Sequence, residues 1–122
     1  MSKLFEETTI NGLKLKNRSV CSATWNGMAN ADGSCSQKMI DSVTKPAKGG
    51  VGMTIGGAAF VSRAGHLFPG QGGIYSDDLL PGLTSMSRAV HQAGGSIISQ
   101  LRHGGIAANP GLTGQDPWCR QC

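Results

Sequence analysis

The sequence predicts an α/β fold, a partial (β/α)8 TIM barrel, from two observations. Strand-like and helix-like segments alternate after a short N-terminal hairpin, in the order hairpin, strand, helix, strand, helix, strand. The loops that follow strands are long, whereas each turn from a helix to the next strand is a Gly-Gly pair. This asymmetry is typical of a (β/α) barrel. An open doubly wound sheet shares the alternation, but no GxGxxG follows the first strand, which disfavours a dinucleotide-binding fold.

The N-terminal segment predicts a small hairpin. Thr8–Ile10 and Leu13–Leu15 flank Asn11-Gly12, a pair that readily adopts the positive φ angles of a tight hairpin turn. Residues 19–23 then form an expected buried strand, and residues 25–33 form an expected loop rich in Asn, Asp and Gly.

Residues 36–48 are predicted to be the first helix. Either Ser34 or Ser36 is suited to cap its start, and Gly49-Gly50 follows its end. Its apolar face is expected to comprise Met39, Ile40, Val43 and Ala47. Pro46 costs roughly 3 kcal/mol in a helix interior, because it lacks the N–H group and clashes with the preceding turn. We therefore expect the helix to kink there or to end early.

Two further strands and a second helix are expected downstream. Residues 51–55 form the second predicted strand, which runs into a stretch of small residues at 56–59. Residues 60–78 form a long Gly-rich loop, and residues 96–101 form the third strand, with a loop-like segment from 102 onward. The second helix is predicted from apolar residues at helical spacing, namely Leu79, Leu83, Met86, Val90 and Ala93.

Composition excludes several classes of protein. Many of the 19 glycines among 122 residues occur in pairs after predicted helices and strands, which favours tight loops over disorder. The net charge of +4 comes from scattered Lys and Arg with few aromatic residues, so nucleic acid is not an expected partner. Neither an N-terminal apolar signal segment nor an apolar run approaching 18 residues is present, so we expect no membrane span and a cytoplasmic protein.

The cysteine pattern predicts free thiols. Cys21 and Cys35 belong to different expected elements, whereas Cys119 and Cys122 form one CxxC motif. One CxxC is half of a zinc site, and neither a second half nor an HxxH spacing accompanies it. We therefore predict no metal site and a reducing environment.

Small residues at the ends of the first two strands are candidate ligand contacts. Ser22, Ala23 and Thr24 end the first strand, where small side chains let a flat ring approach the backbone and hydroxyl and N–H groups can bond its heteroatoms. The alternative is an ordinary strand end. Ala58 follows two glycines at the end of the second strand, which leaves room for a ligand or for close helix packing.

Gln100 lies in an otherwise apolar strand. An unpaired buried amide costs about 1–3 kcal/mol, so we expect this side chain to have partners. Its donor and acceptor suit an imide-like edge such as that of a flavin, although neighbouring backbone would also satisfy them. His103, just beyond, suits an acid/base, anion-binding or structural role, and Trp25 is suited either to border a ring or to pack in the core.

Taken together, these residues resemble a known family. The motifs that carry the resemblance, in this order, are Lys3-Leu-Phe, Thr9-Ile-Asn-Gly-Leu-Lys-Leu-Lys-Asn-Arg, Ser22-Ala-Thr-Trp, Gly49-Gly-Val-Gly, Ile74-Tyr-Ser-Asp-Asp and Gln100-Leu-Arg-His-Gly-Gly. The series is similar to the N-terminal part of the NADH:flavin oxidoreductase family, also called Old Yellow Enzyme, over residues 3–114. It looks closest to the bacterial branch with Ser-Ala-Thr-Trp after the first strand.

The resemblance implies an FMN-containing TIM barrel that takes hydride from NAD(P)H onto the flavin and passes it to a small-molecule substrate with an activated alkene. Residues 1–122 would be the N-terminal part of that single domain, with 115–122 as an irregular tail. The cofactor-binding residues implied are Ser22, Ala23 and Thr24 along the isoalloxazine, Trp25 at a neighbouring position that often tunes it, Ala58 beside the ring, and Gln100 on the pyrimidine.

The sequence also departs from the family's pattern. Ala23 stands where many relatives have Pro, and Pro46 interrupts the first helix. The family's His-x-x-His or His-x-x-Asn pair, its proton-donating Tyr, its Arg near the flavin and its phosphate-binding loops lie further along than residue 122. We therefore assign no catalytic residue within this chain. Cys119 and Cys122 do not fall where larger relatives hold an iron–sulfur cluster.

The length leads to two expectations. Barrels of this type need ~250 residues, so the three strands and two helices predicted here do not close one. We expect an oxidoreductase segment that, alone, binds FMN weakly or not at all and does not turn over. The alternative is a non-catalytic truncated remnant or a self-associating half-barrel whose open strand edges form a homo-oligomer. A barrel enzyme with a Schiff-base lysine fits poorly, because no Lys ends a predicted strand.

Overall fold

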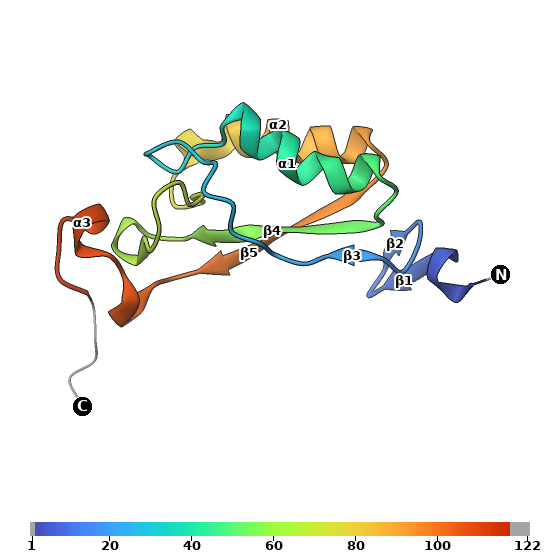
Figure 1. Ribbon diagram of the computed structural model, residues 1–122, viewed down its shortest axis with the longest axis horizontal. Helices are drawn as coiled ribbons and strands as arrows, with labels where there is room; N and C mark the ends of the chain where they lie inside the picture. Colours follow the sequence, from blue (N-terminus) through green and yellow to red (C-terminus); the bar gives the residue numbers. More distant parts are fainter. Residues whose placement is uncertain (1, 118–122) are drawn as a thin grey trace.

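Two layers form the main body of the chain in the computed structural model, which describes residues 2–117. The sheet comprises β3 (Val20–Cys21), β4 (Met53–Phe60) and β5 (Ser96–Arg102), all parallel and in the order β3-β4-β5. Helices α1 (Gln37–Lys48) and α2 (Leu80–Gln92) cover one face of this sheet (Figure 1). The strand–helix–strand order predicted from the sequence is therefore confirmed.

The N-terminal hairpin lies beyond the end at which the sheet strands begin (Figure 1). It pairs β1 (Thr8–Ile10) with β2 (Leu13–Leu15) in antiparallel register. The turn residues Asn11 and Gly12 have φ angles of 44° and 86°, as the Asn-Gly pair predicts. The short 3-10 turn η1 (Lys3–Phe5) precedes the hairpin.

Asn17, which is 9% exposed, lies at the edge of the sheet where the parallel strands begin, and its hydrogen bonds connect two segments there. Its Nδ2 donates to the carbonyl of Gly50 at 2.7 Å, and its Oδ1 accepts from the N–H and the hydroxyl of Ser19 at 3.1 and 2.6 Å. One buried amide thus joins the start of β3 to the turn that precedes β4.

The core lies between the two helices and the sheet. It is formed by the predicted inner faces of the helices, with Met39, Val43 and Ala47 from α1 and Met86 and Val90 from α2. Close packing at the Gly94-Gly95 turn lets β5 begin beneath α1, since a Cβ on Gly95 would lie 2.7 Å from the Cβ of Ala47. The apolar spacing along the two helices therefore predicts the core residues correctly.

Helix α1 continues to Lys48, in agreement with the predicted range 36–48. Of the two effects expected of Pro46, a kink or an early end, the early end does not occur. Ser36 is the cap, and its hydroxyl accepts from the N–H of Met39 at 3.1 Å. The proline lies in the last turn, where the buried residues Val43 and Ala47 hold the inner face against the core. Burial of these side chains offsets the single missing helix hydrogen bond.

The lengths of two strands differ from the sequence prediction. β3 pairs only at Val20 and Cys21, so it is shorter than the expected 19–23. β4 extends through the small residues to Phe60, because its ladder with β5 continues there. The extent of each strand is thus set by its neighbour rather than by its own composition.

The segment after β5 is less irregular than predicted. It contains the 3-10 turn η4 (Gly105–Ala107) and a short helix α3 (Pro110–Thr113). The side chain of Asn109 caps α3 by accepting from the N–H of Gly111 at 2.9 Å. Residues 118–122, with the CxxC motif and most of the predicted tail, lie outside the described residues. None of the described helices is both long and apolar enough to cross a membrane.

Candidate functional site

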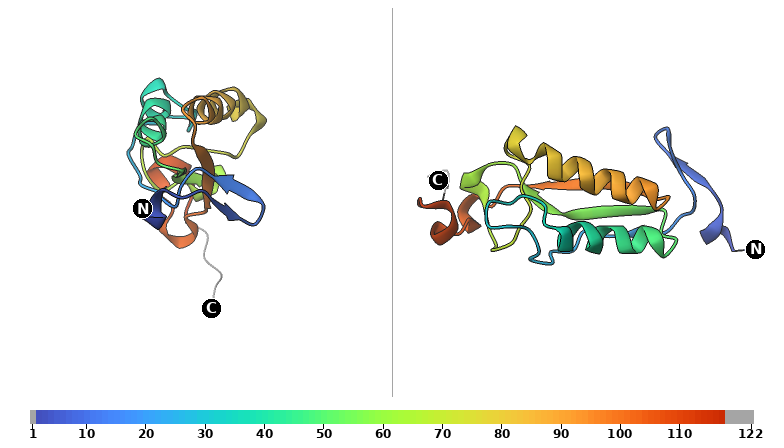
Figure 2. Two further views of the ribbon diagram at one scale, coloured as in Figure 1. Left: turned by 90° about the vertical axis from the view of Figure 1, so that its right-hand side faces the viewer. Right: turned by 90° about the horizontal axis from the view of Figure 1, so that it is seen from above.

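The carboxyl edge of the sheet is formed by the loops that follow β3 and β4, with α3 beside them (Figures 1 and 2). The chain after β3 passes close to β4 here. A Cβ on Gly57 would lie 3.0 Å from the carbonyl oxygen of Thr24, so the glycine makes room for this approach. Thr24, Trp25 and Ala58 consequently line one shallow depression, together with parts of the loop after β4.

A β-bulge in β4 places Gln100 of β5 beside Ala58. Gly56 pairs with Ser99 and Ala59 pairs with Leu101, so the two residues Gly57 and Ala58 lie opposite the single residue Gln100. A bulge of this kind bends the strand and re-aims the side chains next to it. The structure therefore places Thr24, Ala58 and Gln100 on three adjacent segments at one edge of the sheet.

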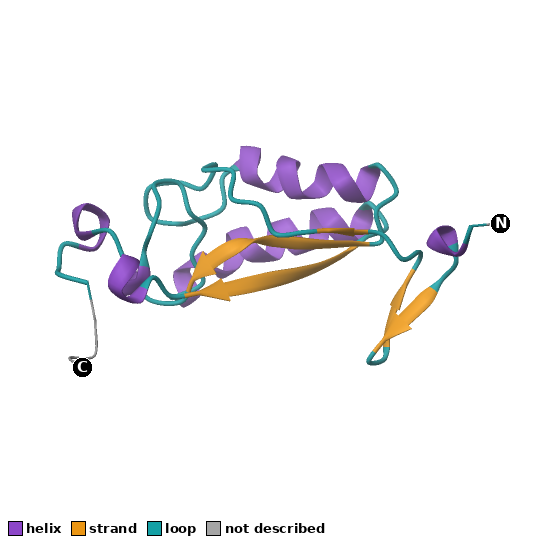
Figure 3. Ribbon diagram, turned by 60° about the horizontal axis from the view of Figure 1, so that its bottom comes forward, coloured by secondary structure: helices purple, strands orange, loops and turns teal. Residues whose placement is uncertain are grey.

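The exposure of Gln100 differs from our expectation. We predicted a buried amide that needs partners, but this side chain is exposed. The reason is that the helices cover only one face of the sheet. Gln100 lies three residues after Ile97, which packs against the core, so it belongs to the opposite face, which the helices leave open (Figure 3). Ser22 and Thr24 are also exposed, Ala23 and Ala58 are half-buried, and Trp25 is 53% exposed. The predicted contacts thus face outward, where a ligand can reach them.

The hydroxyl of Thr24 turns back toward its own segment and donates to the carbonyl of Ser22 at 3.4 Å. Trp25 instead contacts the loop after β4, with its ring centroid 5.2 Å from that of Phe68. Trp25 is therefore not a core residue. It lies at the carboxyl edge, where the alternative role of bordering a ring remains open to it.

The loop after β4 is anchored by an aromatic stack. Phe60, at the end of β4, stacks on His66 with centroids 4.2 Å apart and on Tyr75 with centroids 5.1 Å apart. The hydroxyl of Tyr75 donates to the carbonyl of Asp32 at 2.7 Å, which ties this loop to the loop after β3. The hydroxyl and N–H of Ser34 donate to the Asp32 carboxylate and lower its pKa.

Gln71 is a residue of this edge that sequence reasoning missed. Its side chain is 2% exposed, and its amide bonds both the end of β4 and the loop. In the sequence it stands among glycines in a long loop, a setting that gives no indication of burial. His103, which the sequence left open between several roles, is exposed, and its Nδ1 accepts from the N–H of Gly105 at 3.0 Å.

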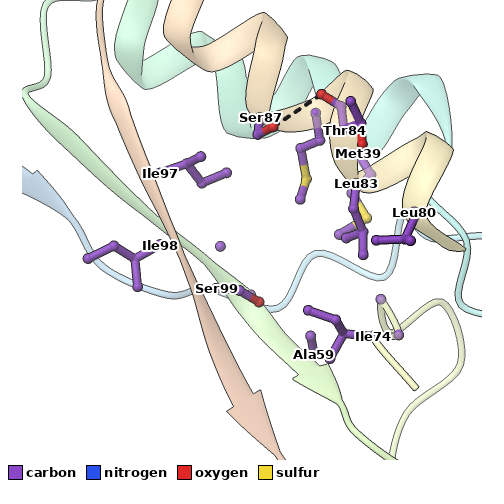
Figure 4. A pocket seen from close by; sticks show the side chains of 15 residues that line it. Met39, Ala59, Ile74, Leu80, Leu83, Thr84, Ser87, Ile97, Ile98 and Ser99 are labelled. Atoms are coloured by element: carbon purple, nitrogen blue, oxygen red, sulfur yellow. Dashed lines mark hydrogen bonds between the residues drawn. The ribbon is translucent and has the colours of Figure 1, made fainter. Parts of the chain in front are cut away.

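An apolar pocket of about 350 Å³ lies elsewhere, between α2 and the sheet. Figure 4 shows Leu83 and Met39 from the helical layer facing Ile97 from β5 across it. It lies between the two layers and extends to the loop after β4 at Gly72, Gly73 and Ile74. A polar heteroaromatic ring needs donors and acceptors at its edge, so the carboxyl edge suits such a ring better.

The described residues contain no group of three or more His, Cys, Asp or Glu side chains placed to hold a metal ion. Cys21 and Cys35 are free, and partial burial raises the pKa of the Cys35 thiol. Hydrogen-bond donors and acceptors at the carboxyl edge include the Gln100 amide and the hydroxyls of Ser22 and Thr24, all on exposed residues.

Comparison with known proteins identifies relatives of this chain. The model of the NADH:flavin oxidoreductase / NADH oxidase family matches residues 3–119. An NADH:acrylate oxidoreductase from Vibrio harveyi is 36% identical over 115 residues, which are 93% of this chain and 11% of that protein. An NADH oxidase from Thermoanaerobacter brockii is 35% identical over 111 residues, which are 90% of this chain and 17% of that protein.

Solved structures show the same relationship. The Old Yellow Enzyme homologue from Zymomonas mobilis superposes with a TM-score of 0.86 at 28% identity, over 95% of this chain and 32% of that chain. The Old Yellow Enzyme from Pichia sp. AKU4542 gives 0.84 at 27% identity, over 90% and 28%. The chain thus spans a third or less of each of these relatives and forms part of a (β/α)8 barrel. It belongs to the NADH:flavin oxidoreductase / NADH oxidase family, a family of FMN-dependent enzymes.

Proposed function

We propose that residues 1–122 supply one side of the flavin site of an ene-reductase-type enzyme, which moves hydride from NAD(P)H through FMN to an activated alkene. The observation that carries the proposal is the bulge, which sets Ala58 opposite Gln100 at the edge where Thr24 also lies. A relative named for acrylate supports the substrate class, because acrylate is an α,β-unsaturated carboxylate.

The residues at this edge fit a flavin. Gly57 lets the Thr24 backbone approach β4 closely, which places Thr24 and Trp25 beside Ala58. The exposed amide of Gln100 offers a donor and an acceptor to the pyrimidine edge. Ser22, Ala23, Thr24 and Trp25 would lie along the ring, and Ala58 would contact it from the next strand. Bound FMN would supply the hydride chemistry, while these residues would hold and orient it.

We place the substrate-binding and proton-donating residues outside this segment. The three histidines, His66, His91 and His103, form no His-x-x-His or His-x-x-Asn pair. By itself, the segment would bind FMN weakly and would not turn over, because it holds only one side of the site.

The flavin site is tested by titrating the chain with FMN and following backbone amide chemical shifts, which detect weak binding. We expect the shifts to centre on Thr24, Gly57, Ala58 and Gln100. Gln100→Leu should weaken binding roughly tenfold, because the ring loses its amide partner. Gln92→Leu, at an exposed position of α2, is the control and should leave binding unchanged. Shifts confined to the apolar pocket beneath α2, or none in the wild type, would refute this site.

A second candidate function, a self-associating half-barrel, is favoured by the outer edge of β5. No strand within residues 2–117 pairs with this edge, and Ile98 and Leu101 on the strand are 44% and 63% exposed. Strands of this kind pair readily with other chains. We expect light scattering with size exclusion to give a mass above 12.6 kDa, and Ile98→Lys with Leu101→Lys to lower it. A wild-type monomer at all concentrations would exclude this function.

A further inference from the structure

Gln71 joins two elements that are far apart in the sequence. Its Nε2 donates to the carbonyl of Ala58 at 2.8 Å, and its Oε1 accepts from the N–H groups of Leu67 and Phe68 at 3.0 and 3.3 Å. With 2% of its surface exposed, it is among the most buried polar residues of the described chain. A side chain so enclosed has little freedom, so the three groups it bonds are held in one arrangement.

The bulge explains why this contact matters. Ala58 is one of the two residues that face the single residue Gln100, and a bulged pair lacks the full ladder bonding of a regular strand. The donor from Gln71 gives the Ala58 carbonyl a partner at this irregular step. The conformation of the bulge, and with it the direction of Ala58, is therefore linked to a side chain of the following loop.

We propose that Gln71 is a positioning residue, which fixes the β4 bulge and so sets Ala58 and Gln100 in the arrangement that the flavin site uses. It contacts no ligand in this role and acts through the Ala58 backbone. The consequence for flavin binding rests on the proposed function, whereas the effect on the bulge does not. The competing interpretation is that Gln71 only adds to overall stability.

Gln71→Met separates these interpretations, because methionine has a similar size and lacks both hydrogen-bonding groups. Asn17→Ala is the matched control, since Asn17 is also buried and also bonds three groups, but at the opposite edge of the sheet. The diagnostic amides are those of Val61 and the β5 residues 100–102, none of which bonds Gln71. We expect their hydrogen exchange to be about tenfold faster in Gln71→Met, at denaturant midpoints similar to those of the control.

Gln71→Glu adds a pH-dependent measurement whose result a role in stability alone would not explain. An ionised carboxylate can accept from the loop N–H groups but cannot donate to the Ala58 carbonyl, whereas the protonated acid can do both. Burial favours the neutral form of a carboxyl group. The amide chemical shifts of residues 100–102 should therefore move away from wild-type values at high pH and return toward them as the pH falls.

The last experiment is an FMN titration of the wild type and of Gln71→Met. In the wild type, FMN should shift the Gln100 amide, and in Gln71→Met this response should be lost. If FMN shifts nothing in the wild type, the proposed flavin site fails, while the exchange and pH results still decide the role of Gln71. Exchange in Gln71→Met that is unchanged at residues 100–102, or that rises uniformly along the chain as in Asn17→Ala, would overturn the proposal.

Discussion

Replacing Phe60 with alanine is expected to unfold a large share of the molecules at room temperature. The side chain is 2% exposed and stacks between His66 and Tyr75, so its removal leaves a cavity that rigid neighbours cannot fill. Substitutions of this kind cost about 3–5 kcal/mol. Since small domains are stable by only about 5–15 kcal/mol, and this sheet has two open edges, little stability should remain.

Urea denaturation followed by far-UV circular dichroism measures this loss. Phe5→Ala is the control, because Phe5 is 67% exposed and should contribute less than about 0.5 kcal/mol. Phe60 also bridges the loop through its backbone, since its N–H donates to Gly72 and its carbonyl accepts from Ile74, both at 3.0 Å. These bonds survive the substitution. Equal midpoints for the two variants would show that the aromatic stack does not support the fold.

Local patterns predicted the helices and turns correctly because neighbours along the chain determine them. The spacing of Met39, Val43 and Ala47 fixes which side of α1 meets the core, and the glycine pair after each helix fixes where it ends. Asn11-Gly12 likewise determines the hairpin turn through its own φ preferences. None of these features needs information from a distant residue.

Features set by pairing between strands could not be predicted in this way. The short β3, the extension of β4 and the bulge opposite Gln100 all depend on which residues face each other across the ladder. The burial predicted for Gln100 was wrong because the sequence does not show that the sheet face opposite the helices stays open. Only the assembled layers reveal which face of β5 is covered.

The candidate site was predictable in part. Residues at the carboxyl ends of parallel strands meet at one edge, which is why Thr24, Ala58 and Gln100 could be grouped from the sequence. Gln71 could not, because its role depends on a loop that folds back onto β4 over thirteen residues. The loop's path is set by contacts such as the Tyr75 hydroxyl on Asp32, for which the sequence carries no local pattern.

Gly70→Ala is the second change for which we expect a large effect, because it forces apart the two loops that form the carboxyl edge. Gly70 has a φ of +69°, and a Cβ there would overlap the backbone of Gly27. The Gly70 carbonyl also accepts from the N–H of Ala29 at 2.9 Å, so the loops cannot separate without losing this bond. We expect a loss of about 2–4 kcal/mol from strain and broken contacts together.

Gly114→Ala separates the cost of backbone strain from the cost of the clash with Gly27. Gly114 has nearly the same φ, +70°, but a Cβ there would meet nothing within 4 Å. Its cost should be the conformational one alone, roughly 1–2 kcal/mol. The difference between the variants in urea denaturation therefore measures the clash with Gly27. Because Trp25 packs over Gly27, Gly70→Ala should also shift the tryptophan emission, whereas Gly114→Ala should not. If both variants lose the same stability and keep the same emission, the two loops are not in the close contact on which the shape of the carboxyl edge depends.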